Sequence, residues 1–228
     1  MTKTEPVAVV VGAGPGNGAA LAARFSGAGY AVAVLSRQHR TLEPLKQQVP
    51  DAQAFTCDVA DPNSVADTFE RIRVELGQVD TLLFNAGSGV FKDFADTSVQ
   101  EFEDSWRVNA LGAFLCAQQV LPHMRDAGSG NIVFIGATAS RRGGAKTSAF
   151  ASAKAAQRSL AESLARSFWP EGIHVSLIVV DGKIGTASKT APGLLNPAAI
   201  AETAYQLCQQ DRSAWSFEVE ARPSVERW

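Results

Sequence analysis

The stretch VAVVVGAGPGNGAALAARF, residues 7–25, decides the fold class of this chain. Its first five residues are apolar and mostly β-branched, which is typical of a strand buried on both faces of a parallel sheet. A glycine-rich turn follows at once, and a run of alanines and a leucine then begins a helix. A strand, a glycine turn and a helix in direct succession predict the start of a βαβ unit with a ligand at the turn.

The glycines of this turn, Gly12, Gly16 and Gly18, allow a tight backbone path that comes close to a ligand. Backbone N–H groups at the start of a helix favour an anion, and a pyrophosphate suits both features. A glycine-rich turn can also be merely tight, so the motif gains its weight from the strand before it and the helix after it. We therefore predict a dinucleotide site that includes Asn17 with the three glycines.

The rest of the sequence continues the alternation of strands and helices. Apolar runs predict strands at residues 31–35, 54–57, 81–84, 132–135, 175–180 and, at an edge, 215–220. Helices are predicted at residues 18–27, 41–48, 61–76, 99–124 and 149–168, with one more before the last strand. This pattern predicts α/β architecture: a doubly wound parallel sheet in one domain over residues 1–228, with helices on both faces and ligands at the carboxyl ends of the strands.

Composition excludes several classes of protein. The 228 residues are 46% hydrophobic and 19% charged, with a formal net charge of −2, which predicts a globular domain. Lys and Arg are scattered, so we expect no nucleic-acid partner, and the first apolar run is too short for a membrane segment. Cys57, Cys116 and Cys208 have no metal-ligand or disulfide spacing, so we expect no metal and a cytoplasmic protein.

Further motifs follow the later strands, and together they resemble the short-chain dehydrogenase/reductase family. The match comprises the G-x-x-x-G-x-G turn, Asp58-Val59, Asn85-Ala86-Gly87, Asn109 and Lys154, in this order over about residues 7–220. Any one of them also fits a helix cap or a surface charge. The resemblance implies a Rossmann fold, cofactor contacts at Asp58, Val59, Asn85, Ala86 and Gly87, and active-site roles for Asn109 and Lys154, with Lys154 on the nicotinamide ribose.

The chain departs from the family at two catalytic positions. The family's Tyr-x-x-x-Lys reads here as Phe150-Ala151-Ser152-Ala153-Lys154, and the family serine, thirteen residues before that tyrosine, falls on Ala137. Neither Phe150 nor Ala137 can donate a proton to a developing oxyanion. The proton source stays open among Thr138, Ser140, Ser148 and a water held by Asn109 and Lys154.

The residues after the second and sixth strands bear on the cofactor and the substrate. The second strand ends at Ser36-Arg37 without a carboxylate, which favours NADP(H) over NAD(H). By resemblance Ile184 and Thr186 lie near the nicotinamide carboxamide, and Asp181 replaces the family proline. Arg141 and Arg142 either meet an acidic substrate or are simply solvated. The short segment between Thr186 and Pro197 predicts a shallow or open substrate pocket.

These observations predict an NADP(H)-dependent oxidoreductase with a non-standard active site. Its small-molecule substrate is either a carbonyl or alcohol compound or one with an activated C=C bond. The alternative is a cofactor-binding pseudo-enzyme that acts as a sensor or as a structural partner without turnover. The resemblance also implies a homodimer or homotetramer that packs through the helices at residues 99–124 and 149–168. Whether Trp228 is buried against a neighbour or in the core stays open.

Overall fold

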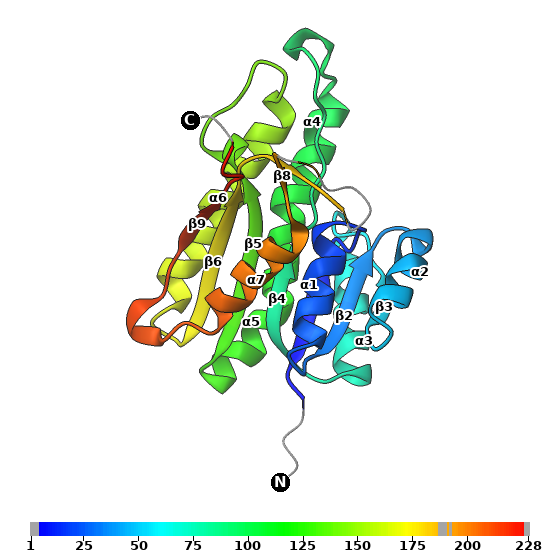
Figure 1. Ribbon diagram of the computed structural model, residues 1–228, viewed down its shortest axis with the longest axis vertical. Helices are drawn as coiled ribbons and strands as arrows, with labels where there is room; N and C mark the ends of the chain where they lie inside the picture. The colour runs from blue at the N-terminus through cyan, green and yellow to red at the C-terminus, as the bar shows by residue number, and fades with distance from the viewer. Residues whose placement is uncertain (1–4, 187–190, 192, 226–228) are drawn as a thin grey trace.

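The main sheet is built from seven parallel strands. The computed structural model describes residues 5–186, 191 and 193–225, without the side chain of Lys46. The strands are β1 (Val7–Val11), β2 (Ala31–Ser36), β3 (Gln53–Thr56), β4 (Val79–Phe84), β5 (Gly130–Ala137), β6 (Ile173–Val180) and β9 (Glu218–Ala221). They pair in the order β3-β2-β1-β4-β5-β6-β9 (Figure 1). The predicted doubly wound parallel sheet is confirmed.

Helices cover both faces of this sheet. They are α1 (Asn17–Ser26), α2 (His39–Gln48), α3 (Pro62–Glu75), α4 (Val99–Trp106), α5 (Gly112–Ala127), α6 (Ser148–Phe168) and α7 (Pro197–Cys208). Buried side chains of α1, α2 and α7 form a core on one face, and those of α3, α5 and α6 form a core on the other. Figure 1 shows α1 and α7 in front of the strands, with α5 and α6 behind them.

The start of α3 illustrates how the sequence sets an element boundary. The Asp61 carboxylate accepts a hydrogen bond of 3.0 Å from the backbone N–H of Asn63, and Pro62 occupies the first helical position. Proline costs nothing there, because its missing N–H would have no partner in the helix. Asp61 is therefore the N-cap of α3.

The predicted helix at residues 99–124 contains a feature that periodicity did not reveal. Between α4 and α5 the chain makes a π-helical turn at Arg107–Leu111, and Asn109 lies fully buried within it. π-Helical turns are rare and are found frequently at functional sites.

The edge strand β9 begins later than the strand predicted at residues 215–220. The indole of Trp215 stacks on the imidazole of His174, with the ring centroids 4.7 Å apart, and β9 begins at Glu218. The alternating glutamates of β9 also suit an edge, because charged side chains discourage pairing with a further strand. Trp228 lies outside the described residues.

The order in which the chain adds strands to the sheet reverses between β1 and β4. The chain winds from β1 outward through β2 and β3, and then returns to β4 beside β1 and proceeds the other way. Ligands of such sheets bind beyond the carboxyl ends of the strands at this point. None of the helices in the described part of the chain is both long and apolar enough to cross a lipid bilayer.

Candidate functional site

The glycine turn packs tightly against the end of β4. Gly12 adopts a φ of +86°, and a Cβ added to it would lie 2.5 Å from the backbone of Ala86. The side chain of Asn85 donates a hydrogen bond of 2.8 Å to the carbonyl of Gly12. Only glycine satisfies both the positive φ and the close approach at this position. Asn85 and Ala86 therefore fix the turn from the neighbouring strand.

The amino terminus of α1 is open to an anion. Gly16 is the N-cap and makes no side-chain capping bond, and the first turn of α1 holds no acidic residue. Gly14 has open space beside it, whereas a Cβ on Gly18 would lie 2.7 Å from Cα of Ala13. Both polar atoms of the buried Asn17 amide lack a partner in the described structure. Free helix-terminal N–H groups and an unsatisfied amide fit the pyrophosphate of a dinucleotide.

Asp58 and Val59 lie just beyond β3, which ends at Thr56. The Asp58 carboxylate accepts a hydrogen bond of 3.0 Å from the N–H of Ala60 and leaves its exposed side chain at the surface of the turn. Val59 is buried, and a Cβ on Gly112 would lie 2.9 Å from its side chain. The interaction of Val59 with Gly112 thereby brings the start of α5 against this edge of the sheet.

Ser36 and Arg37 end β2 on the same edge. The Ser36 hydroxyl accepts a weak hydrogen bond of 3.4 Å from the N–H of Gln38. The exposed Arg37 makes no ion pair within the described residues, whereas Arg40 donates to the amide oxygen of Gln38 at 2.8 Å. The guanidinium of Arg37 is therefore available to bind an anion.

Lys154 is a buried cation at the base of a cleft. Its ammonium donates to the carbonyl of Ile135 at 2.9 Å and to the amide oxygen of Gln157 at 3.0 Å. Burial lowers the pKa of Lys154 to about 7 because desolvation disfavours the charged form. Its third N–H remains for a ligand in the cleft.

Asn109 approaches the same place from the opposite side. Its amide nitrogen donates to the carbonyls of Ser88 and Ser105 at 2.6 and 2.8 Å, and its amide oxygen is buried without a partner. A Cβ added to Gly87 would lie 3.4 Å from that oxygen and 3.6 Å from Nζ of Lys154. Asn109 and Lys154 therefore meet across Gly87, as the family pattern implies.

The cleft beyond these residues has a volume of about 560 Å³. The predicted site residues Asn85, Gly87, Ala137, Phe150, Lys154 and Ile184 all line it, together with Ser88, Gly89, Phe91, Ile135, Gly136, Thr138, Ala139, Thr147, Val180, Gly182 and Lys183. The Phe150 ring lies against Gly89, where an added Cβ would be 2.6 Å from the ring, and it packs against the exposed Phe91 with the centroids 5.3 Å apart. This contribution from Phe91 and Gly89 was not predicted, because no motif or periodicity marks either residue.

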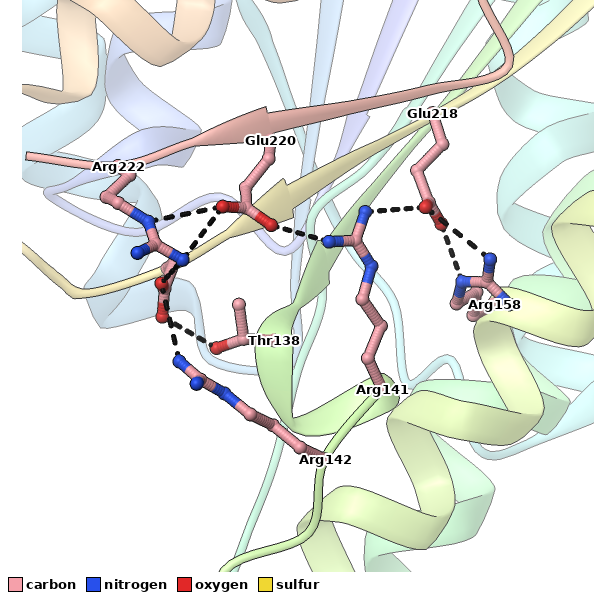
Figure 2. Close-up of polar contacts among 8 residues, drawn as sticks. Thr138, Arg141, Arg142, Arg158, Glu218, Glu220 and Arg222 are labelled. Carbon is pink, nitrogen blue, oxygen red and sulfur yellow. Dashed lines mark hydrogen bonds and ion pairs between the residues drawn. The ribbon is translucent and has the colours of Figure 1, made fainter. Parts of the chain in front are cut away.

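An ion-pair network borders the cleft on the side of β9 (Figure 2). The buried Asp181 accepts a hydrogen bond of 2.9 Å from the Thr138 hydroxyl and pairs with Arg222 at 2.5 Å and with Arg142 at 3.6 Å. The Thr138 hydroxyl proton is therefore engaged with Asp181. Ser140, another predicted proton donor, has a buried hydroxyl without a partner among the described residues.

Arg141 is neither free for a substrate nor simply solvated. It donates to Glu218 and Glu220 of β9, each at 2.5 Å, and Glu218 also accepts from Arg158 of α6 at 2.6 Å (Figure 2). Burial opposes ionisation of Glu218, but Arg158 and Arg141 hold its pKa below the usual value. The interpretation of Arg141 as simply solvated is wrong, because sequence alone did not place β9 beside it.

The segment after β6 lies over the glycine turn. A small two-stranded pairing joins β7 (Lys183–Ile184) to β8 (Leu194–Leu195), and a Cβ on Gly16 would lie 3.9 Å from the side chain of Ile184. Thr186 is half-buried next to this pairing. Half of the segment predicted to leave the pocket open, residues 187–190 and 192, lies outside the described residues.

Other chemistries find no support in the described part of the chain. No group of His, Cys, Asp and Glu side chains there has the arrangement of a metal site. Cys57, Cys116 and Cys208 carry free thiols, and burial raises the pKa of each. A neutral buried thiol is a poor nucleophile.

Comparison with known proteins agrees with this geometry. The family model described as short chain dehydrogenase matches residues 6–191. The 2-(R)-hydroxypropyl-CoM dehydrogenase of Xanthobacter autotrophicus is 34% identical over 183 residues, which cover 75% of this chain and 72% of that protein. A short-chain dehydrogenase from Rhodopseudomonas palustris superposes with a TM-score of 0.86 at 32% identity, covering 97% of this chain and 99% of the other.

A metagenomic short-chain oxidoreductase, solved in complex with NADP, superposes with a TM-score of 0.85 at 25% identity, covering 97% of this chain and 98% of the other. The match of the family model extends from before β1 to beyond β7, and so includes the glycine turn, the π-helical turn and the cleft. This chain belongs to the short-chain dehydrogenase/reductase family of oxidoreductases.

Proposed function

We propose that this chain is an NADP(H)-dependent oxidoreductase whose proton delivery differs from that of its family. The observation that carries the proposal is the meeting of Lys154 and Asn109 across Gly87 at the base of a cleft, close to the open amino terminus of α1. The whole chain would then be one catalytic domain, located in the cytoplasm in agreement with its free thiols.

The residues that would hold the cofactor lie along one edge of the sheet. Backbone N–H groups at Gly16 to Gly18 would bind the pyrophosphate, and Lys154 would bind the ribose next to the nicotinamide. Asp58 and Val59 would enclose the adenosine half, and the segment Asn85 to Gly87 would contact the cofactor between that half and Lys154. Ile184 and Thr186 would lie by the carboxamide. The unpaired guanidinium of Arg37 supports NADP(H), since a 2′-phosphate offers it charge-assisted bonds.

The nicotinamide, when bound, supplies or accepts a hydride at a substrate carbon. The chain must then add or remove a proton, and neither Phe150 nor Ala137 has one to exchange. Lys154 is suited to this task, because its pKa of about 7 lets Nζ gain and lose a proton near neutrality. A water between Nζ and the unsatisfied amide oxygen of Asn109 would carry that proton to the cleft.

The proposed substrates are carbonyl compounds and compounds with an activated C=C bond. Reduction of a carbonyl needs a donor next to the oxygen, where this cleft presents the Phe150 ring and the Ala137 methyl. Reduction of a C=C bond instead delivers the proton to carbon, and a water or Lys154 can do this without the tyrosine hydroxyl. The site therefore favours the second reaction class over the first.

We also propose that the protein is a homodimer or homotetramer. Three large apolar side chains on α4 and α5 are each about two-fifths exposed: Phe102, Trp106 and Phe114. They form an apolar face on these helices that is in contact with water. Burying such a face against a second copy is favourable.

Titration with NADPH and NADH by calorimetry, followed by turnover assays with ketone, aldehyde and enone panels, tests the proposed function. Tight NADPH binding with turnover of one panel is the expected result. Binding without turnover on any panel would favour the alternative of a sensor or structural partner. Absence of binding by both nucleotides to the folded protein would overturn the proposal.

A further inference from the structure

The cleft carries positive charge that no carboxylate balances from within. Lys154 and Lys183 are the titratable residues among its described lining, which includes no Asp or Glu. Lys154 is already held by Ile135 and Gln157 at the base. Lys183 stands exposed at the rim and makes no ion pair in the described structure. A cation in this position attracts an anionic group on whatever enters the cleft.

Asp181 is close to Lys183 in the sequence, but it does not line the cleft. Asp181 comes two residues before Lys183 but pairs with Arg222 and Arg142 and accepts from Thr138 (Figure 2). Its charge is thus balanced on the side of β9, and none of it is left to neutralise Lys183. The network also pairs Arg141 with Glu218 and Glu220, and Lys183 is the lysine at the rim of the cleft that makes no ion pair in the described structure.

Two phenylalanine rings also line the cleft. The rings of Phe91 and Phe150 pack with centroids 5.3 Å apart and an interplanar angle of 45°. Phe91 is 66% exposed, although phenylalanine side chains are usually buried in proteins. A flat ligand that covers this ring would remove apolar area from water and gain the favourable geometry of aromatic contacts.

We propose that the cleft binds a flat conjugated compound bearing a carboxylate, with its apolar body on Phe91 and Phe150 and its carboxylate on Lys183. This inference rests on the proposed function in taking the cleft as the substrate site. It narrows the substrate class from any carbonyl or enone to an acidic, conjugated one. A conjugated acid also suits a site in which a proton is delivered to carbon rather than to oxygen.

The test compares three probes by calorimetry, with and without NADPH. 2-Naphthoate is flat and acidic, 2-naphthalenemethanol is flat and neutral, and decahydro-2-naphthoate is acidic but not flat. We expect 2-naphthoate to bind about tenfold more tightly than the alcohol, as one charge-assisted hydrogen bond at a solvated rim allows. It should also bind about fivefold more tightly than the saturated acid, as one aromatic contact allows.

Variants assign these preferences to residues. Lys183→Gln is expected to remove the preference for acid over alcohol, and Phe91→Ala the preference for the flat acid. Arg166→Gln removes an exposed cation from the far part of α6, and Phe94→Ala removes an exposed ring outside the lining. Both controls should bind all three probes as the parent does. Circular dichroism and melting curves establish that each variant is folded.

Each outcome separates this inference from the proposed function. If the alcohol binds as tightly as the acid, or Lys183→Gln leaves acid binding unchanged, the inference is overturned even though NADPH binds. A loss of NADPH affinity in Lys183→Gln, with acid binding intact, would place Lys183 on the cofactor and likewise overturn it. Acid binding without any NADPH binding would instead overturn the proposed function and leave the acid site standing.

Discussion

The hydroxyl of Thr138 donates a hydrogen bond of 2.9 Å to the carboxylate of Asp181, which links the ends of β5 and β6 beside the cleft. The same carboxylate pairs with Arg222, which directly follows β9, at 2.5 Å. Three neighbouring strand ends are thereby joined through one buried acid. The residue that replaces the family's proline is thus the centre of a structural contact, and the replacement ties the C-terminal strand to the active site.

Loss of this acid should cost stability. Asp181→Asn keeps the shape of the side chain but removes the negative charge that pairs with Arg222, so we expect the free energy of unfolding to fall by about 1–3 kcal/mol. Asp93→Asn is the matched control, because its pair with Lys146 is exposed and should be worth less than about 1 kcal/mol. Urea unfolding of both variants measures the difference. Equal effects would mean that the buried network adds nothing.

Restoring the family's proton donors should change the reaction. Phe150→Tyr places a hydroxyl in the cleft four residues before Lys154, and Ala137→Ser adds a second donor. General acid catalysis contributes typically about 10²–10⁴-fold, so we expect the double variant to reduce ketones at least tenfold faster than the parent. Phe94→Tyr adds the same hydroxyl outside the cleft and should not alter the rate. An unchanged rate in the double variant would show that the ketone is not bound productively.

Much of the fold could be predicted from the sequence, because buried parallel strands leave unmistakable apolar runs. Site residues at strand ends, such as Asn85, were predictable for the same reason, since the carboxyl ends of parallel strands share one edge. The meeting of Asn109 with Lys154 across Gly87 followed from the family pattern. These predictions depend on local sequence and on a topology with few alternatives.

The parts that were not predicted depend on contacts between distant segments. The π-helical turn accompanies bonds from the Asn109 amide to two backbone carbonyls, and an apolar repeat carries no trace of such bonds. The partners of Asp181 and Arg141 come from β9, whose register against β6 is a tertiary property. Phe91 lies in a loop, where exposure cannot be derived from periodicity. Side-chain partners across loops therefore needed the structure.

The nucleotide preference should reside in Arg37. Arg37→Ala removes the exposed guanidinium at the end of β2, and we expect NADPH affinity to fall about 10- to 100-fold, the worth of charge-assisted bonds to one phosphate. NADH, which lacks the 2′-phosphate, serves as the internal control and should bind the variant and the parent alike. Calorimetry with both nucleotides checks this. An equal loss for NADH would assign Arg37 to a part of the site that the two nucleotides share.

The apolar face of α4 should mediate self-association. Trp106→Glu introduces a charge where the indole is 43% exposed, and burying that charge in an interface is costly. We expect sedimentation velocity to show smaller species for this variant than for the parent. Val74→Glu on α3 is the control, since Val74 is 77% exposed but lies away from this face. A parent that sediments as a monomer would contradict the proposed assembly.

The ionisation of Lys154 should be visible in the stability of the protein. Burial lowers the pKa of this lysine from 10.5 to about 7. Between these two values the unfolded chain binds a proton at this position that the folded chain does not. The free energy of unfolding therefore rises with pH across this window, with a slope of up to about 1.4 kcal/mol per pH unit. Below the pKa of Lys154 in the folded protein, this lysine is protonated in both the folded and the unfolded state. The folded state then carries the full cost of burying the charge.

Replacing the lysine by methionine removes this proton from both states. We expect Lys154→Met to be more stable than the parent near neutrality. This difference in stability should shrink steadily as the pH rises toward the pKa of the lysine in the unfolded chain. Urea unfolding of both proteins at several pH values measures it. Val120→Ala, an uncharged change in the core behind the same sheet, should alter stability by an amount that does not vary with pH. If the difference in the free energy of unfolding between Lys154→Met and the parent also does not vary with pH, the ammonium stays charged in the folded protein. Lys154 would then be excluded as the source of the proton.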